Sequence, residues 1–248
     1  MRTNLSKRSI TLLLVAIGLV AAAGTAYAAV SVSFSAKAKP NRANKPTGLY
    51  VDIKSTDPAA AQPPIMTRIV MKLPSGKYNA RHFRRCSLAR LQAKGPQGCS
   101  KRSKIGTGKG VGMARPVVMD PVNGKLTIFN GTRSGGRDRI FVYVFPDLGP
   151  TFVSVGKVKK TRRGYTLDFS IPPIKTLPSA PDASVVSVNT KTPVKRVTKR
   201  KGKRKKKYHL IVAPRKCKGK WKGSGTFYFA TGETKRVSIS QKCRKTRR

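Results

Sequence analysis

The stretch CSLARLQAKGPQGCSKRSKIGTGKGVG, residues 86–112, joins two cysteines, a short helical pattern and a glycine run in one segment. Ser87 is a preferred residue type for a helix N-cap, and Gly95-Pro96 is a helix stop. Further along, glycines at 106, 108, 110 and 112 recur at every second position, which is the period of a β-strand. The stretch therefore predicts a short helical turn that leads into a strand with one bare face, which another backbone or a large side chain can approach.

These glycines do not have the pattern of a phosphate-binding loop. A Walker loop needs G-x4-G-K followed by Ser or Thr, whereas Gly108-Lys109 is followed by Gly110 and position 103 is Ser. A dinucleotide-binding loop needs a helix after its glycines, whereas here the alternation continues as far as Arg115-Pro116. We therefore expect this segment to have a structural role rather than to bind a cofactor.

Period-two alternation of apolar residues recurs along most of the chain. Proline-rich breaks at 55–64 and 172–181 are expected to be loops, and Thr231-Gly232 is a hairpin signal. The pattern predicts an all-β fold, an antiparallel β-sandwich or open barrel, with one short helix in the 86–99 loop and a C-terminal β-hairpin at 208–248. The expected strands include 30–34, 49–53, 69–73, 125–131, 139–145, 152–158, 165–171, 184–190, 208–214, 225–231 and 235–241.

Residues 1–28 have the three parts of an export signal peptide. Basic residues precede an apolar run from Ile10 to Gly24, and Ala26-Tyr27-Ala28 is a small-x-small cleavage site. We expect cleavage after Ala28 and a single β domain over 29–248 that is secreted or associated with the cell envelope. The alternative is an uncleaved N-terminal anchor, because the apolar run continued to Val30 has about the length that a bilayer requires.

Four cysteines in an exported chain indicate disulfides. Three pairings are possible, and pairing nearest neighbours, Cys86 with Cys99 and Cys217 with Cys243, keeps each bridge within one local unit and would staple the C-terminal hairpin to the strand before it. Structural zinc needs close pairs such as C-x2-C, which the sequence lacks, so no metal site is predicted. His82 lies four residues before Cys86, but a ready disulfide partner makes a Cys/His nucleophile or ligand pair a poor interpretation.

Several of these residues also form an ordered pattern. It comprises Pro74, Gly76, Tyr78-Asn79, Phe83, Cys86, Leu91, Gly95, Cys99, Ser103, Ile105-Gly106, Gly108, Phe129-Asn130-Gly131, Pro214, Cys217, Trp221 and Gly232. The chain resembles a group of uncharacterised secreted actinobacterial β-rich proteins with paired cysteines. The resemblance covers most of the exported part and is sharpest at 74–110; Ser100 departs from it, since proline is expected after the second cysteine. It implies fold and export, and it supplies no activity.

Positive charge is the most distinctive property of the sequence. The chain has 54 Lys and Arg against 8 Asp and Glu, a formal net charge of +46, and removal of the three cations in the signal leaves +43. The peak is KRVTKRKGKRKKK at 195–207, which we expect to be a flexible, solvated loop because such a run repels itself and cannot be buried. The candidate polyanion-binding residues are Lys195, Arg196, Lys199, Arg200, Lys201, Lys203, Arg204, Lys205, Lys206 and Lys207.

A charge run of this kind is a multivalent counterion for a polyanion, and its affinity should fall steeply with salt. Wall phosphate polymers, DNA and acidic polysaccharide fit equally, and an anionic membrane surface is a further possible partner. Specific reading of a nucleic-acid sequence is not predicted: Tyr208, Trp221, Phe227, Tyr228 and Phe229 could stack on bases, but at strand spacing they more often pack as core residues. The rival interpretation is a structural surface protein without a specific ligand.

Little in the sequence indicates catalysis. G-x-S-x-G and H-E-x-x-H are absent, and His82 and His209 are the only histidines. Asp52, Asp138, Asp147 and Asp168 could meet in space, although each fits a strand face or turn. Asn130-Gly131-Thr132 matches a glycosylation sequon but fits a tight turn better. We therefore predict no enzyme, no catalytic residue, no cofactor and no small-molecule substrate; a hydrolase is the less favoured alternative.

Overall fold

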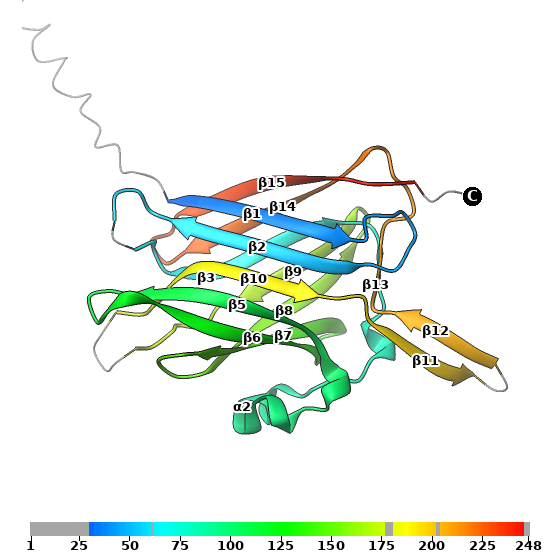
Figure 1. Cartoon of the computed structure of the whole chain (residues 1–248), viewed down its shortest axis with the longest axis horizontal. Helices are drawn as coiled ribbons and strands as arrows, with labels where there is room; N and C mark the ends of the chain where they lie inside the picture. Colours follow the sequence, from blue (N-terminus) through cyan, green and yellow to red (C-terminus); the bar gives the residue numbers. More distant parts are fainter. Residues whose placement is uncertain (1–29, 61, 177–180, 202–203, 246–248) are drawn as a thin grey trace, which may run out of the picture.

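The structure, a computed structural model, describes residues 30–245 except 61, 177–180 and 202–203. The predicted export signal at 1–28 lies outside the described residues. The fold is all-β, as predicted, with antiparallel pairing along one large sheet (Figure 1). Its strands, in spatial order, are β1 (Ser31–Lys39), β2 (Gly48–Thr56), β10 (Ser184–Thr192), β5 (Lys104–Ala114), β6 (Val118–Ser134), β7 (Arg137–Pro146), β8 (Phe152–Thr161), β9 (Gly164–Ser170), β3 (Met66–Pro74), β14 (Lys220–Phe229) and β15 (Thr234–Lys242).

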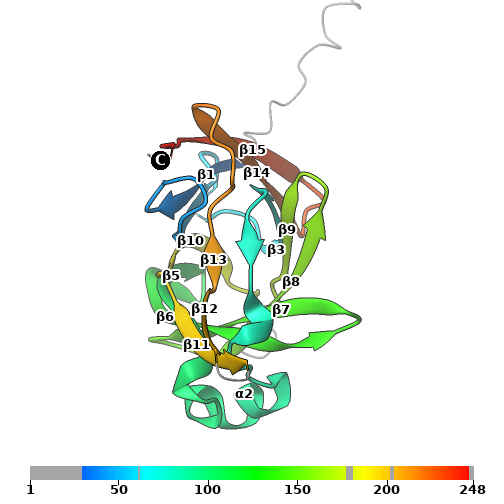
Figure 2. The same ribbon diagram turned by 90° about the vertical axis from the view of Figure 1, so that its right-hand side faces the viewer.

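The sheet curls until its two edge strands meet, so the barrel alternative of the sequence prediction describes it best (Figure 2). Each strand of the 11-stranded sheet pairs antiparallel with its spatial neighbour, so strand direction reverses at every step. With an odd number of strands, the two edge strands, β1 and β15, run in the same direction. The Gln241 side chain bridges this seam: its Oε1 accepts from the Ala38 N–H at 2.8 Å and its Nε2 donates to the Ala38 carbonyl at 2.8 Å. The side-chain amide of Gln241 thus gives Ala38 the two hydrogen bonds that the backbone of a neighbouring strand would provide.

The inner face of the barrel holds the main core. Val51, Ile53, Ile69, Met71 and Leu167 are buried there. Phe34 and Phe227 meet edge to face, with ring centroids 5.6 Å apart, and so join β1 to β14 across the interior. These contacts follow the predicted alternation, in which every second residue of a strand faces inward.

The glycine-faced strand is β5, and its bare face serves close approach. A Cβ at Gly106 would lie 2.5 Å from the Lys191 carbonyl oxygen, and one at Gly108 would also collide with the backbone of β10. A Cβ at Gly112 would meet nothing closer than the Ser184 carbonyl oxygen at 3.4 Å. The first two glycines therefore let β10 pack tightly, as predicted, whereas a Cβ at Gly112 would make only an ordinary van der Waals contact.

The segment between β3 and β5 covers the outside of the barrel. It contains β4 (Lys77–Tyr78), α2 (Leu88–Lys94) and three short 3-10 turns, η1 (Ala80–His82), η2 (Gly95–Gly98) and η3 (Lys101–Ser103). The predicted helix is present, and Ser87 caps it by accepting a hydrogen bond from the Arg90 N–H. Leu91 of α2 is fully buried with Phe129, Phe141 and Tyr143, which are the outward residues of β6 and β7.

Both predicted disulfides form. Cys86–Cys99 ties the two ends of the α2 loop, and Cys217–Cys243 ties the end of β15 to the segment before β14. Trp221 is buried beside Cys217 and Cys243, with its indole N–H donating to the Lys216 carbonyl at 3.1 Å. This confirms the interpretation of Trp221 as packing around a disulfide. The C-terminal hairpin is β14–β15, and β14 pairs with β3, so the hairpin is part of the main sheet.

Strand directions give the barrel two distinct ends. The connections that follow β1, β3, β6, β8 and β10 lie at one end, which we call the ribbon end, and those that follow β2, β5, β7, β9 and β14 lie at the other, the mouth end (Figure 1). The segment containing α2 and the basic segment that follows β10 both belong to the ribbon end. The two ends also differ in charge and in packing.

Candidate polyanion-binding surface

The basic segment forms a two-stranded ribbon instead of the predicted loop. β11 (Arg196–Lys201) and β12 (Arg204–His209) pair antiparallel, and the ribbon projects from the barrel (Figure 1). The charge pattern alone favours a loop, because like charges placed directly opposite destabilise a strand pair. The ladder forms nonetheless because its own backbone groups pair and because its base is anchored to the barrel.

The anchor at the base of the ribbon is partly aromatic. Tyr208 stacks on His82 of η1, with ring centroids 3.6 Å apart and an interplanar angle of 16°. Val197, directly opposite Tyr208, packs against the main core, and the Leu210 N–H donates to the Lys195 carbonyl at 2.9 Å. The basic segment therefore has one attached end and one projecting, charged end.

Cations dominate the projecting part of the ribbon. Lys199 lies opposite Lys206, and Arg200 lies opposite Lys205. Among the described residues, no candidate cation of this segment has an acidic partner within ion-pair distance. The exposed side chains include Lys199, Arg200, Arg204, Lys205, Lys206 and Lys207. Lys203 lies outside the described residues.

His82 reports the electrostatic environment at the ribbon base. Its burial lowers the pKa, and the positive charges of Arg81, Lys199 and Lys206 lower it further. Arg81 lies in η1, Lys199 in β11 and Lys206 in β12, so cations of both ribbon strands act on an imidazole of η1. A neutral imidazole keeps a lone pair on one ring nitrogen, which can accept a hydrogen bond. Here the Arg81 Nε donates to the His82 Nε2 at 3.2 Å.

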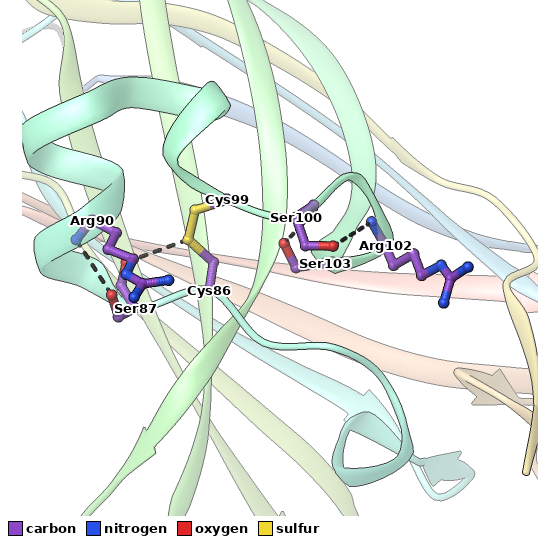
Figure 3. Close-up of a disulfide and its surroundings, with 7 residues drawn as sticks. All are labelled: Cys86, Ser87, Arg90, Cys99, Ser100, Arg102 and Ser103. Carbon is purple, nitrogen blue, oxygen red and sulfur yellow. Dashed lines mark hydrogen bonds between the residues drawn. A yellow bond between two sulfur atoms is a disulfide. The ribbon is translucent and has the colours of Figure 1, made fainter.

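A second cationic feature, which we call the arginine pocket, adjoins the Cys86–Cys99 disulfide. It is a hollow of about 610 Å³ lined by Arg84, Arg85, Arg90 and Arg102 together with the disulfide, Ser87, Gly98, Ser100 and Thr132. Arg90 and Arg102 lie on opposite sides of the disulfide (Figure 3). Their backbones are fixed by serine caps, because Ser87 Oγ accepts from the Arg90 N–H and Ser100 Oγ from the Arg102 N–H, each at 3.3 Å. Four guanidinium groups around one hollow suit phosphate, sulfate or carboxylate oxygens.

Only one arginine of the pocket has an acidic partner among the described residues. Arg85 contacts Asp138 with a distance of 3.3 Å between Nη2 and Oδ1, and Asp138 also pairs with Arg133. Arg84, Arg90 and Arg102 are exposed. The sequence prediction missed this pocket. The signal for it was the run of thirteen cations without an acid between Asp57 and Asp120.

Asn130 holds the segment that connects the two cationic features. It lies in β6 and is fully buried, with its Nδ2 within 3.1 Å, 3.4 Å and 3.0 Å of the carbonyl oxygens of Ala80, Phe83 and Arg84. The prediction of a tight turn at Asn130-Gly131-Thr132 is therefore wrong, because the three residues continue a strand. Burial also removes Asn130 from the surface that glycosylation requires.

Acidic side chains gather at the opposite end. Five of the eight acids, Asp57, Asp120, Asp147, Asp182 and Glu233, lie in or beside the connections of the mouth end. Both cationic features lie at the ribbon end. The barrel is therefore electrostatically asymmetric along its axis, with its excess of positive charge at the ribbon end.

Two of the candidate carboxylates for catalysis, Asp52 and Asp168, are paired with other side chains. Asp168 forms a bidentate pair with Arg68, with 2.8 Å and 2.7 Å between nitrogen and oxygen atoms, and this hydrogen bond lowers the pKa of Asp168. Asp52 accepts from the Asn189 amide at 2.8 Å. Within the described ranges, no three His, Cys, Asp or Glu side chains gather closely enough to hold a metal ion.

The aromatic residues near the basic segment offer little stacking surface. Trp221, Phe227 and Phe229 are buried, Tyr208 is covered on one side by His82, and the Arg68 guanidinium lies 5.3 Å from the Tyr228 ring centroid. They therefore pack within the protein, as expected for aromatics at strand spacing. In the part of the chain that the structure describes, no helix is both long and apolar enough to cross a membrane.

Comparison with known proteins gives no relative. No protein-family model, no curated protein and no solved structure matches the chain.

Proposed function

We propose that the protein is an exported, non-enzymatic β protein that binds anionic polymers of the envelope or the extracellular space. The ribbon and the arginine pocket are the proposed contacts, and wall phosphate polymers, DNA and acidic polysaccharide are the candidate polymers. The observation that carries the proposal is the ribbon itself: cations lie opposite cations across a formed strand pair, without acidic partners among the described residues.

An anionic polymer would relieve the repulsion within the ribbon. Each like-charge pair weakens the ladder, so the ribbon is less stable alone than with phosphate or carboxylate groups between its cations. Polymer binding also releases condensed counterions, which favours association at low salt. The arginine pocket adds guanidinium groups that can hold oxygen atoms of one polymer unit in a bidentate manner.

The disulfides support a location outside the cytoplasm. Both pairs are formed, and such bonds persist in oxidising compartments. Export, by the signal predicted at 1–28, would place the cationic end among wall phosphate polymers, extracellular DNA and acidic polysaccharide. The buried aromatics favour contact with the polymer backbone over stacking on bases.

The test measures binding of the protein to duplex DNA, teichoic acid and an acidic polysaccharide over a range of salt concentrations. A ribbon variant carries Lys199→Gln, Arg200→Gln, Lys205→Gln and Lys206→Gln. A control variant carries Lys37→Gln, Lys54→Gln, Lys72→Gln and Lys222→Gln, four exposed cations on main-sheet strands, and so has the same net charge. For DNA, each lost phosphate contact reduces the slope of log K against log salt by about 0.9, so the ribbon variant is expected to lose up to about 4 units of slope.

Two results would contradict the proposal. If the parent protein binds all three polymers without a salt slope, association is not electrostatic. If the ribbon and control variants lose the same amount of affinity, net charge alone attracts the polymer and the ribbon is not the contact.

A further inference from the structure

The mouth end of the barrel contains an apolar cavity that the polyanion proposal does not use. The cavity has a volume of about 510 Å³, within the range of small-molecule sites. It is lined by side chains of β2, β3, β5, β6, β7, β8, β9 and β10 and by the connections after β5, β7 and β9. Eight strands and three loops thus converge on one space.

The width of the barrel explains why this space exists. About eight strands give an interior that side chains can just fill, whereas larger barrels enclose cavities. Here the barrel has 11 strands, and glycines at 110 and 112 remove side chains from part of its wall. As a consequence, Val142, Val144 and Val188 point inward yet are only half-buried.

The cavity reaches the surface at the mouth end. Leu148, in the connection after β7, lines it and is 60% exposed. An exposed large apolar side chain at the rim of an apolar cavity fits a ligand entrance.

The chemistry of the lining suits a mainly hydrocarbon ligand. Its residues are mostly Val, Ile, Leu, Gly and Pro, with Phe152 and Phe169 as the aromatic members. Ser154 Oγ, which also lines the cavity, donates to the Ser170 carbonyl at 2.7 Å and is therefore already paired. The other hydroxyl-bearing residues of the lining are Thr176, Ser187, Thr190 and Thr192, so a ligand with many polar groups along its length would leave most of them unpaired, which is costly.

One charged group lines the cavity, and it fixes the expected head group. Lys175, in the connection after β9, is 72% exposed at its side chain and pairs with Asp182 at 3.1 Å between Nζ and Oδ1. An ammonium group at the rim of a hydrocarbon site can hold a carboxylate while its stem lies along apolar surface, and a ligand carboxylate would compete with Asp182 for it. We infer that the cavity binds one long-chain fatty acid, with the chain inside the barrel and the carboxylate beside Lys175.

The test is titration of the purified protein with palmitate, followed by calorimetry and by displacement of a fluorescent fatty acid. Binding should have a negative heat-capacity change and should change little with salt. Removal of two methylenes from the acid is expected to weaken binding about tenfold, from the transfer free energy of each CH₂. Palmitate should bind more tightly than hexadecanol, and Lys175→Gln should abolish that difference.

Two variants locate the site. Val144→Trp fills the cavity from β7 and should abolish palmitate binding. Phe145 is the next residue of β7 and faces outward, so Phe145→Trp should leave palmitate binding unchanged. Val188→Phe fills the same space from β10, so a folding defect in one variant does not remove the test.

Palmitate binding that survives both filling variants, or that is absent from the parent, would overturn the inference. Equal affinity for palmitate and hexadecanol would overturn the assignment of the carboxylate. Polymer binding at the ribbon is measured separately in each variant, so loss of one site is distinguishable from loss of the other.

Discussion

Replacement of Asn130 by alanine tests most directly whether this side chain holds the η1 segment in place at the ribbon end. The amide nitrogen of Asn130 has two hydrogens and serves three carbonyl oxygens, those of Ala80, Phe83 and Arg84, at 3.0–3.4 Å. Loss of about two hydrogen bonds costs about 0.5–1.5 kcal/mol each, and a carbonyl left unpaired raises the cost, whereas the Ala80 carbonyl keeps the Phe83 N–H as a donor. We expect Asn130→Ala to lower the free energy of unfolding by about 2–4 kcal/mol.

Urea denaturation measures this change. The midpoint should fall while the slope of the free energy against urea stays constant, because the change acts on stability rather than on the surface exposed by unfolding. Lys125→Ala, an exposed position on the same strand, is the matched control and should shift stability by less than about 0.5 kcal/mol. A loss below about 0.5 kcal/mol in Asn130→Ala would refute the argument that this amide holds the η1 segment.

Two further predictions concern the ribbon base and the glycine strand. The pKa of His82 is lowered by burial and by nearby cations, so the unfolded chain takes up a proton at a higher pH than the folded protein. The free energy of unfolding should therefore decline as the pH falls below about 6.5. A bound polyanion should raise the pKa of His82, and NMR titration of the ring measures the shift. No change in the His82 titration at saturating polymer would show that the polymer binds away from the ribbon base. Gly108→Ala is expected to cost about 1–3 kcal/mol in thermal denaturation because its Cβ meets the β10 backbone, whereas Gly112→Ala should be nearly neutral; equal effects would contradict the assigned packing.

Residues with one dominant local interaction could be predicted from the sequence. Ser87 caps a helix because its hydroxyl serves the backbone three residues on, and the glycine alternation allows close approach of a backbone wherever the partner lies. The disulfides follow from sequence proximity in a chain with a predicted export signal. These features depend on neighbours in sequence, so the pattern contains most of the information.

Features that depend on assembly could not be predicted. The choice between sandwich and barrel depends on strand number and on closure at Gln241, which is an ordinary polar residue in the sequence. The ribbon at 195–207 depends on the stacking of Tyr208 on His82, which lie far apart along the chain. The apolar cavity arises from eight strands at once, so no spacing of residues indicates it, whereas the arginine pocket forms mainly from one segment, 84–102, whose cations are visible in the sequence but whose convergence depends on the fold.

The geometry of the barrel keeps its two proposed sites apart. Strands of about ten residues extend about 33 Å, which exceeds the Debye length of about 8–10 Å at physiological ionic strength. If the proposed polymer bound at the ribbon end, it would therefore neither repel nor attract a carboxylate beside Lys175 to a measurable degree. In that proposed complex the cation-rich ribbon end would face the polymer, because the acids of the mouth end lie at the other end of the strands. The opening lined by Leu148 would then face away from the polymer, so the two proposed sites could be occupied together.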